Sequence, residues 1–177
     1  MSKVRFISDL HIGHNKIAEF SGPFRGGVTN VDEHDQWIVD QWNSVVSKQD
    51  VVIVLGDVCF DQSRFETFKK MKGNKHLLLG NHDRFSANKY LPYFNKIIGY
   101  QKYKNMAWLS HAPIHPGSLR NLFNIHGHTH ERSLTDLRYI SVCVEVLNGK
   151  PIKFEDIIEM MHARKEQIKM QGFTVPL

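Results

Sequence analysis

The stretch VVIVLGD, residues 51–57, decides the fold class of this 177-residue chain. Its five consecutive branched apolar residues predict a buried strand, and Gly56 ends that strand. Asp57 follows at once, so a carboxylate stands just beyond the carboxyl end of the strand. In open α/β sheets, ligands bind outside the carboxyl ends of the strands. The stretch therefore predicts an α/β protein that carries a polar site at one edge of its sheet.

Four other apolar segments repeat this arrangement of a strand followed by a polar turn; they span residues 4–8, 76–80, 106–110 and 122–125. The turns are Asp9-Leu10-His11, Gly80-Asn81-His82-Asp83, Ser110-His111 and Gly127-His128-Thr129-His130. At the strand ends these distant residues would converge, and the glycines would let the backbone approach closely. Neutral imidazole is the commonest metal ligand in proteins, so the turns predict a metal site. For the stretch FNIHGHTHER, residues 123–132, a His-rich surface loop is the alternative.

The remaining segments predict helices between the strands and no second domain. Helical patterns cover three segments, residues 31–46, 63–72 and 154–167. Further elements are a short helix with edge strands over 85–105, a loop over 112–121 and a strand over 138–146. No internal repeat, low-complexity tract or linker is visible. We therefore expect residues 1–177 to form a single domain.

Composition favours a soluble protein with anionic partners. Hydrophobic residues make up 41% and charged residues 23%, the formal net charge is +5, and the pI is about 9.2. These values favour nucleotides and phosphoesters as partners. Without a block of five or more Lys and Arg residues, they do not single out DNA binding. Cys59 and Cys143 lie among apolar residues and are expected to be buried thiols. No signal-like or membrane-length apolar run is present, so we expect a cytoplasmic protein that has no membrane partner.

The order of the five polar turns resembles that of the calcineurin-like metallophosphoesterases. Along nearly the whole chain it reads D-x-H, G-D, G-N-H-D, H and G-H-x-H. Small bacterial and phage-borne members are similar also in SDLHIGHNKI (8–17), HAPIHP (111–116) and KPI (150–152). The resemblance implies a four-layer α/β/β/α sandwich, in which two β-sheets pack together with helices outside. The ligand turns would then lie at the carboxyl ends of the strands.

The resemblance also implies a two-metal site. One ion would be held by Asp9, His11 and His130, the other by Asn81, His111 and His128, and Asp57 would bridge both. A shared carboxylate can hold two cations about 3.5–4 Å apart and sharpen a bridging water into hydroxide, which attacks phosphorus in line. Nitrogen and oxygen ligands without thiolate suit divalent transition metals. We expect Mn²⁺, with Fe, Zn²⁺, Ni²⁺ and Co²⁺ as alternatives.

His82 is the family's non-ligand histidine, and the resemblance implies that it protonates the leaving oxygen or stabilises charge on the phosphoryl group. Residues predicted to contact substrate are His14, Asn15, His115 and Arg120. Weaker expectations concern other polar and aromatic residues. Phe20, Phe24 and Arg25 could stack a base near the site, although core packing is favoured for the two phenylalanines; His34, His76 and His162 are interpreted as ordinary surface or helix residues; Asn43 could hydrogen-bond the ligand loops and Asp61 could orient His82.

Three functions follow from this pattern. The favoured one is hydrolysis of small phosphoesters, with phosphodiesters or nucleotide-like substrates preferred. The alternatives are a catalytically idle metal-binding or protein-interaction scaffold of the same fold, which the presence of His82 disfavours, and a nuclease. Nucleic acid is not a favoured partner, because no aromatic and basic stripe stands out. A Ser/Thr protein phosphatase is disfavoured as well, because no Asp-Arg-Gly follows Asp57. The sequence leaves the substrate and the oligomeric state open.

Overall fold

The first of two β-sheets is built around the strand that contains residues 51–54. The computed structural model describes residues 2–176. Strand order in this sheet is β4-β3-β2-β1-β9. The strands are β1 (Val4–Ile7), β2 (Val51–Val54), β3 (Asn74–Leu78), β4 (Lys96–Ile98) and β9 (Ile152–Lys153). β1 to β4 are parallel, and only β9 runs antiparallel to its neighbour β1 within this sheet. The carboxyl ends of β1, β2 and β3 therefore lie at the same edge.

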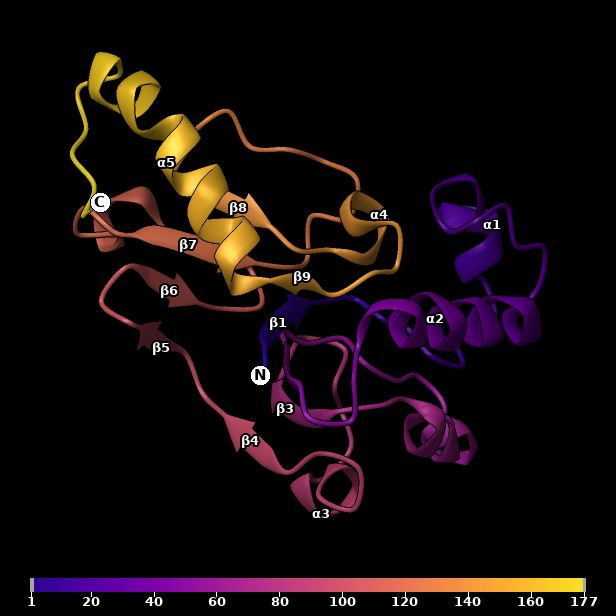
Figure 1. Cartoon of the computed structure of the whole chain (residues 1–177). Coiled ribbons are helices and arrows are strands. Elements are labelled where there is room, and N and C mark those ends of the chain that lie inside the picture. Colours follow the sequence, from indigo (N-terminus) through magenta and orange to yellow (C-terminus); the bar gives the residue numbers. More distant parts are fainter. Residues whose placement is uncertain (1, 177) are drawn as a thin grey trace.

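A second, four-stranded sheet lies beside the first (Figure 1). It has the order β5 (Gln101–Tyr103), β6 (Ala107–Leu109), β7 (Phe123–His126) and β8 (Tyr139–Ser141). β6, β7 and β8 are parallel, and β5 pairs antiparallel to β6. An isolated parallel β-bridge between Ser8, which follows β1, and Cys143, which follows β8, connects the two sheets.

Alternation of side chains along β2 explains how the sheets and helices pack. Val52 and Val54 lie in one apolar cluster with the helix α2, whereas Ile53 and Leu55 lie in a second cluster with residues of the other sheet. Successive side chains of a strand point to opposite faces, so one strand contributes to both clusters. A run of apolar residues without polar interruption is what a strand covered on both faces requires.

Helices cover the outer face of the first sheet. α2 (Val31–Val45) begins at Asn30, whose side chain accepts a hydrogen bond from the backbone N–H of Glu33, and it packs Trp42 into the first cluster. α5 (Phe154–Met170) instead contributes to the second cluster. The shorter helices are α1 (Ile17–Ser21), η1 (Gly22–Phe24), η2 (Gln62–Lys70), α3 (Ala87–Tyr90), η3 (Pro116–Ser118) and α4 (Val144–Leu147).

The predicted α/β fold with two β-sheets and helices is confirmed, and both cysteines are buried as expected. That residues 1–177 form a single domain stays a prediction. Within residues 2–176, the structure contains no helix long and apolar enough to cross a membrane.

Two elements differ from the sequence-based prediction. Residues 62–70 form a 3-10 helix, where we expected a helix over 63–72 without specifying this tighter form. The strand predicted over 138–146 ends at Ser141, and α4 follows. The residues after β8 form hydrogen bonds with Ser8 instead of continuing the strand. The N–H of Ser8 donates to the carbonyl of Val142, and the carbonyl of Ser8 accepts from the N–H of Val144. The N–H of Val142 still bonds the carbonyl of His126 in β7, and beyond it the chain is bonded to Ser8 and enters the helical turn α4.

Asn43 does not reach the loops that carry the predicted ligands, which corrects that expectation. Its amide donates to the carbonyl of Lys70 at 2.8 Å and accepts from the N–H of Lys72 at 2.9 Å. Asn43 therefore fastens α2 to the end of η2.

A buried ion pair ties the start of β2 to β1. Asp50 Oδ2 accepts a hydrogen bond from Arg5 Nε at 2.9 Å, and Oδ1 accepts one from the backbone N–H of Lys3 at 3.1 Å. Burial by itself would raise the pKa of Asp50, but hydrogen bonds from Arg5, Ser47 and Lys3 lower it to about 2. The folded state therefore favours the ionised carboxylate more than the unfolded chain does.

Asp50→Asn should lower the free energy of unfolding at pH 7 by about 2–4 kcal/mol, because Arg5 would keep a buried charge without its partner. The stabilisation by Asp50 is fully present above the unfolded pKa of about 4 and is lost as the pH falls through the folded pKa of about 2. Urea unfolding at pH 7 and pH 3 measures both effects, with Asp40→Asn at an exposed position of α2 as the control. A difference from wild type that is equally large at both pH values would contradict this assignment.

Candidate metal centre

Five polar turns meet where the carboxyl ends of β1, β2 and β3 face those of β6 and β7. Backbone hydrogen bonds tie the turns to one another: the N–H of Asp9 donates to the carbonyl of Gly56, and the N–H of His11 to that of Asp57. Left-handed backbone conformations occur at many of the predicted ligands, namely Asp9 (φ 60°), His11 (54°), Asp57 (53°), His128 (72°) and His130 (52°). Such conformations are unfavourable for residues other than glycine and cluster at functional sites.

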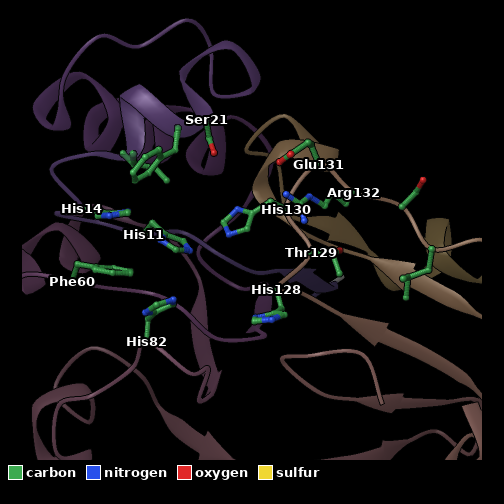
Figure 2. A pocket seen from close by; sticks show the side chains of 14 residues that line it. His11, His14, Ser21, Phe60, His82, His128, Thr129, His130, Glu131 and Arg132 are labelled. Atoms are coloured by element: carbon green, nitrogen blue, oxygen red, sulfur yellow. The ribbon is translucent and has the colours of Figure 1, made fainter. Parts of the chain in front are cut away.

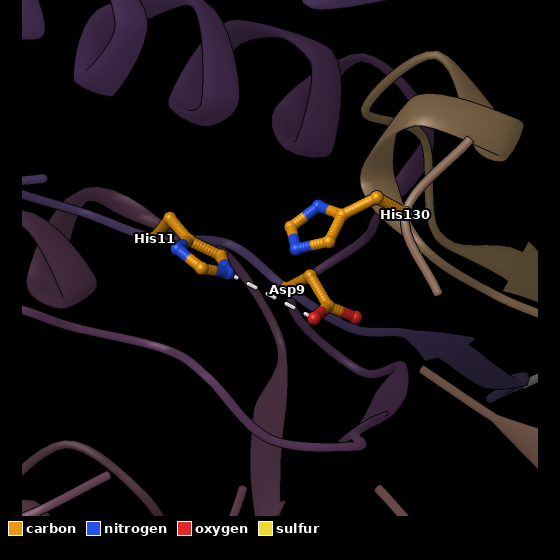
Figure 3. Close-up of side chains that lie close together, drawn as sticks. All are labelled: Asp9, His11 and His130. Carbon is orange, nitrogen blue, oxygen red and sulfur yellow. Dashed lines mark ion pairs between the residues drawn. The ribbon is translucent and has the colours of Figure 1, made fainter. Parts of the chain in front are cut away.

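The first group of possible ligands consists of Asp9, His11 and His130. One nitrogen or oxygen of each residue lies within 4.8 Å of the others, and Figure 3 shows the three side chains directed toward one another. Asp9 Oδ1 and both ring nitrogens of His11 are buried, and none of them has a hydrogen-bond partner among the described residues. Buried polar atoms are nearly always paired, so this group fits a cation with nitrogen and oxygen ligands.

A second group, Asp57, His111 and His128, lies directly beside the first. Asn81 belongs to it as well, because its Oδ1 lies 2.8 Å from His111 Nε2 and 2.9 Å from His128 Nδ1. Asp57 Oδ2 lies 3.3 Å from His111 Nε2 and 3.8 Å from His11 Nε2. Asp57 therefore stands between the two groups, where one carboxylate could contact two cations.

Hydrogen bonds from outside the two groups fix the orientation of their members. His111 Nδ1 lies 2.7 Å from the carbonyl of Leu55, and this bond leaves Nε2 directed at Asp57. Asp83 accepts hydrogen bonds from the backbone N–H groups of Asp57 and Gly80, both at 2.8 Å. In metal sites, such supporting bonds select the tautomer of a histidine and hold its ring in place.

The electrostatics of the site favour added positive charge. Burial would raise the pKa of Asp9, but the adjacent His11 ring, 3.8 Å away, and the positive charge of His111 hold it well below its usual range. Burial would lower the pKa of His111, but Asp57 and Asp9 raise it to about 9. For His11 burial prevails and lowers the pKa to about 4, so that ring is neutral and one of its nitrogens has a lone pair free for a metal ion. A metal cation would take the place of the proton that the carboxylates hold on His111.

His82 lies in neither ligand group. Its backbone N–H donates to Asp57 Oδ1 at 2.8 Å, and its ring lies 5.0 Å from the ring of Phe60 and 6.0 Å from that of His11, measured between centroids. The ring lines a pocket of about 760 Å³ together with His11, His128 and His130 (Figure 2). His82 is therefore close to both groups while its ring nitrogens stay available to a ligand in the pocket.

The predicted substrate contacts are only partly brought to this pocket. His14 lines it, and its ring stacks on Phe60 with centroids 4.3 Å apart. Asn15 lines a neighbouring pocket that also contains Phe60. His115 and Arg120 are exposed and do not line the main pocket.

Hydrogen bonds explain why the loop of residues 112–121, which carries His115 and Arg120, lies away from the main pocket. Two hydrogen bonds join this loop to the second sheet. The N–H of Ile114 donates to Asn124 Oδ1, and the carbonyl of Leu119 accepts from Trp108 Nε1. His115 accepts a hydrogen bond from the N–H of Gly117, so its side chain caps η3.

A buried network behind His130 was missed by the sequence analysis. Arg25 is fully buried, and its Nη2 donates to the carbonyl of Asp9 at 2.8 Å and to Glu145 Oε1 at 2.5 Å. Glu145 Oε1 also lies 2.9 Å from His130 Nδ1, which leaves Nε2 of His130 for the first ligand group. His34 Nε2 lies 2.9 Å from Arg25 Nη1 and is also fully buried.

Several expectations are corrected by these contacts. Arg25 cannot stack a base, because it is buried in a polar network. His34 lies in the helix α2, one of the two places expected for it, but it is buried in the same network and is not a surface residue. Phe20 and Phe24 are 66% and 50% exposed, so they do not pack in the core. Asp61 does not orient His82; its side chain accepts a hydrogen bond from the N–H of Ser63 and begins η2.

Arg25→Leu should destabilise the protein by about 3–5 kcal/mol, because the carboxylate of Glu145 would remain buried without its cation. Adding Glu145→Leu should recover part of this loss, since the double variant buries no unpaired charge. Urea unfolding of the two single variants and the double variant gives the coupling, with the exposed Arg132→Leu as the control. If Arg25→Leu stayed within about 0.5 kcal/mol of the wild type, Arg25 would not be a required partner of Glu145.

Comparisons with known proteins place this site in a family. The family model described as calcineurin-like phosphoesterase matches residues 2–168. MJ1445, an uncharacterized protein of Methanocaldococcus jannaschii, is 31% identical over 178 residues, covering 93% of this chain and 94% of that protein. The Gene 66 protein of Mycobacterium phage D29 is 40% identical over 92 residues, which are 48% of this chain and 42% of the phage protein.

A solved structure agrees with the fold. The protein of unknown function AQ665 from Aquifex aeolicus superimposes with a TM-score of 0.71 at 25% identity, over 90% of this chain and 100% of that chain. Since the family model covers nearly the whole sequence, the chain belongs to the calcineurin-like phosphoesterase family.

Proposed function

We propose that the protein is a dinuclear metal-dependent phosphoesterase that hydrolyses small phosphoesters, with phosphodiesters or nucleotide-like substrates preferred. The observation that carries the proposal is the position of Asp57 Oδ2, 3.3 Å from His111 Nε2 and 3.8 Å from His11 Nε2. One carboxylate thus adjoins two groups of ligand atoms, as a two-metal centre requires.

Each group would hold one divalent cation. The first cation would bind Asp9, His11, His130 and Asp57, and the second would bind Asp57, Asn81, His111 and His128. When bound, the pair would acidify a water molecule and stabilise negative charge on the phosphate oxygens. Imidazole, amide and carboxylate donors without thiolate suit Mn²⁺, with Fe, Zn²⁺, Ni²⁺ and Co²⁺ as alternatives.

The protein's own contribution would be positioning and proton transfer. Glu145 and the carbonyl of Leu55 would keep His130 and His111 in the required orientations. His82, beside the groups but outside them, would donate a proton to the oxygen of the departing alcohol. A cytoplasmic location remains a prediction.

A panel of phosphomonoesters and phosphodiesters, including bis-p-nitrophenyl phosphate and cyclic nucleotides, tests this proposal. Each would be assayed with Mn²⁺, Ni²⁺ and Zn²⁺ added separately to metal-free protein. We expect metal-dependent turnover of at least one diester. Metal binding without turnover of any ester would favour the idle scaffold instead.

Asp57→Asn should remove the charge shared by the two groups. We expect the variant to lose one of two ions or to bind it at least about 100-fold more weakly, since even the loss of a supporting residue costs 10–100-fold. Elemental analysis and calorimetric titration with Mn²⁺ measure this without reference to activity. Asp61→Asn, an exposed residue near the same turn, is the matched control. Two ions held at wild-type affinity would contradict the role of Asp57 as a bridge.

His82→Ala should keep the fold and both ions, because His82 is assigned no bond to a metal. Turnover should fall by about 10²–10⁴, the usual contribution of a positioned acid or base. The fall should be largest for esters of poor leaving groups and smaller for p-nitrophenolate, which is already a stable anion. Steady-state rates across a series of leaving groups measure this. An equal loss for all of them would assign His82 to stabilisation of the phosphoryl charge, and unchanged rates would exclude it from the mechanism.

A further inference from the structure

The pocket that contains the ligand groups extends to the helix α1. Figure 2 shows Ser21 of α1 at one end and His82 at the other, with His11 and His130 between them. Ile17 and Phe20 of α1 line the pocket together with Ser21, and Leu134 lines it from the segment that follows His130. The pocket therefore has two chemically different ends on either side of the candidate metal centre.

The pocket exposes large apolar side chains beside a polar site. Phe20 is 66% exposed and Leu134 is 43% exposed, although both line a pocket that also contains His11 and His130. Large apolar side chains left open in a concave site typically contact a ligand. With a volume of about 760 Å³, the pocket is large enough for more than a phosphate group.

Ring contacts indicate that a flat group fits this end. The centroid of the Phe20 ring lies 6.1 Å from that of His14, which stacks on Phe60 at 4.3 Å. Phe60 in turn lies 5.0 Å from His82. A row of rings thus runs along the pocket from Phe20 to His82. Aromatic faces bind planar groups by stacking, with a gain beyond the buried area alone.

We infer that Ile17 and Phe20 form a subsite for a flat apolar group, an aryl group or a nucleobase, on the ester oxygen that stays bound to phosphorus. The inference rests on the proposed function, in which His82 protonates the departing oxygen at the opposite end. A group at the α1 end is then the one retained in the product. A substrate that occupies both ends carries two ester groups, so the subsite favours phosphodiesters over monoesters.

Two diesters with the same leaving group test the subsite, phenyl p-nitrophenyl phosphate and methyl p-nitrophenyl phosphate. In both, water adds to phosphorus and the bond to p-nitrophenolate breaks, which leaves phenyl phosphate or methyl phosphate and releases a proton. For the Mn²⁺-loaded wild type, kcat/KM should be about ten-fold or more higher for the phenyl diester, the factor expected for stacking of one ring. Phe20→Ala should reduce this ratio at least about five-fold with little change for the methyl diester.

Phe24→Ala is the matched control, because Phe24 is 50% exposed on the same segment but does not line the pocket. For Phe24→Ala, the ratio of kcat/KM for the phenyl diester to that for the methyl diester should equal the wild-type ratio. Equal kcat/KM for both diesters in the wild type, or an unchanged ratio in Phe20→Ala, would overturn the subsite and leave the proposed function intact.

If neither these diesters nor any ester of the panel were hydrolysed, the proposed function would fail, and binding would still decide the subsite. Calorimetric titration with phenyl phosphate and methyl phosphate should then give a preference for the phenyl compound that Phe20→Ala removes. Equal affinities of the wild type for the two compounds would overturn the inference.

Discussion

Two buried carboxylates at the seam between the sheets are the constraint on which the rest of the structure depends. Asp9 is 0% exposed and Asp57 is 2% exposed, and both lie beside His11 Nε2, at 3.8 Å in each case. Two buried negative charges so close together raise the free energy of the folded state unless positive charge or hydrogen-bond donors compensate them. Backbone donors supply part of the compensation, since the N–H of His128 bonds to Asp9 and the N–H of His82 to Asp57. A cation held by the candidate ligand groups would supply the remaining positive charge.

Hydrogen bonds and close backbone contacts between the two sheets hold the turns that carry the candidate ligands. Ser8 bonds the chain after β8 through both its N–H and its carbonyl, and the N–H of Gly127 donates to the carbonyl of His111. At Gly56 there is no room for a side chain, because a Cβ there would lie 2.6 Å from the Cα of Gly80 and from His111 Nδ1. The left-handed backbone at the candidate ligands is therefore held by contacts from several directions, which is the condition under which such strain persists.

The α/β class and the convergence of the polar turns could be predicted because they depend on local patterns, whereas the second sheet and the division of the ligands into two groups were implied by the resemblance to the family. An apolar strand followed by a polar turn is visible in a short stretch, and parallel strands bring such turns to one edge without further information. The buried network could not be predicted in this way. Arg25 and Glu145 are 120 residues apart, and Glu145 stands in a segment whose alternation resembles a strand. An arginine before two glycines has the appearance of a solvated loop, and only the tertiary structure shows what it pairs with.

The exposed and buried parts of the site are connected through one short segment. α1 carries Phe20, which lines the pocket, and after η1 the chain reaches the buried Arg25, which bonds Glu145 and the carbonyl of Asp9. Glu145 in turn orients His130. A displacement of α1 by a bulky group at Phe20 would therefore be resisted by the same buried ion pair that holds a candidate metal ligand. Because the side chains of Arg25 and Glu145 are buried and bond each other, the pair joins the segment that carries Phe20 to a candidate metal ligand, His130.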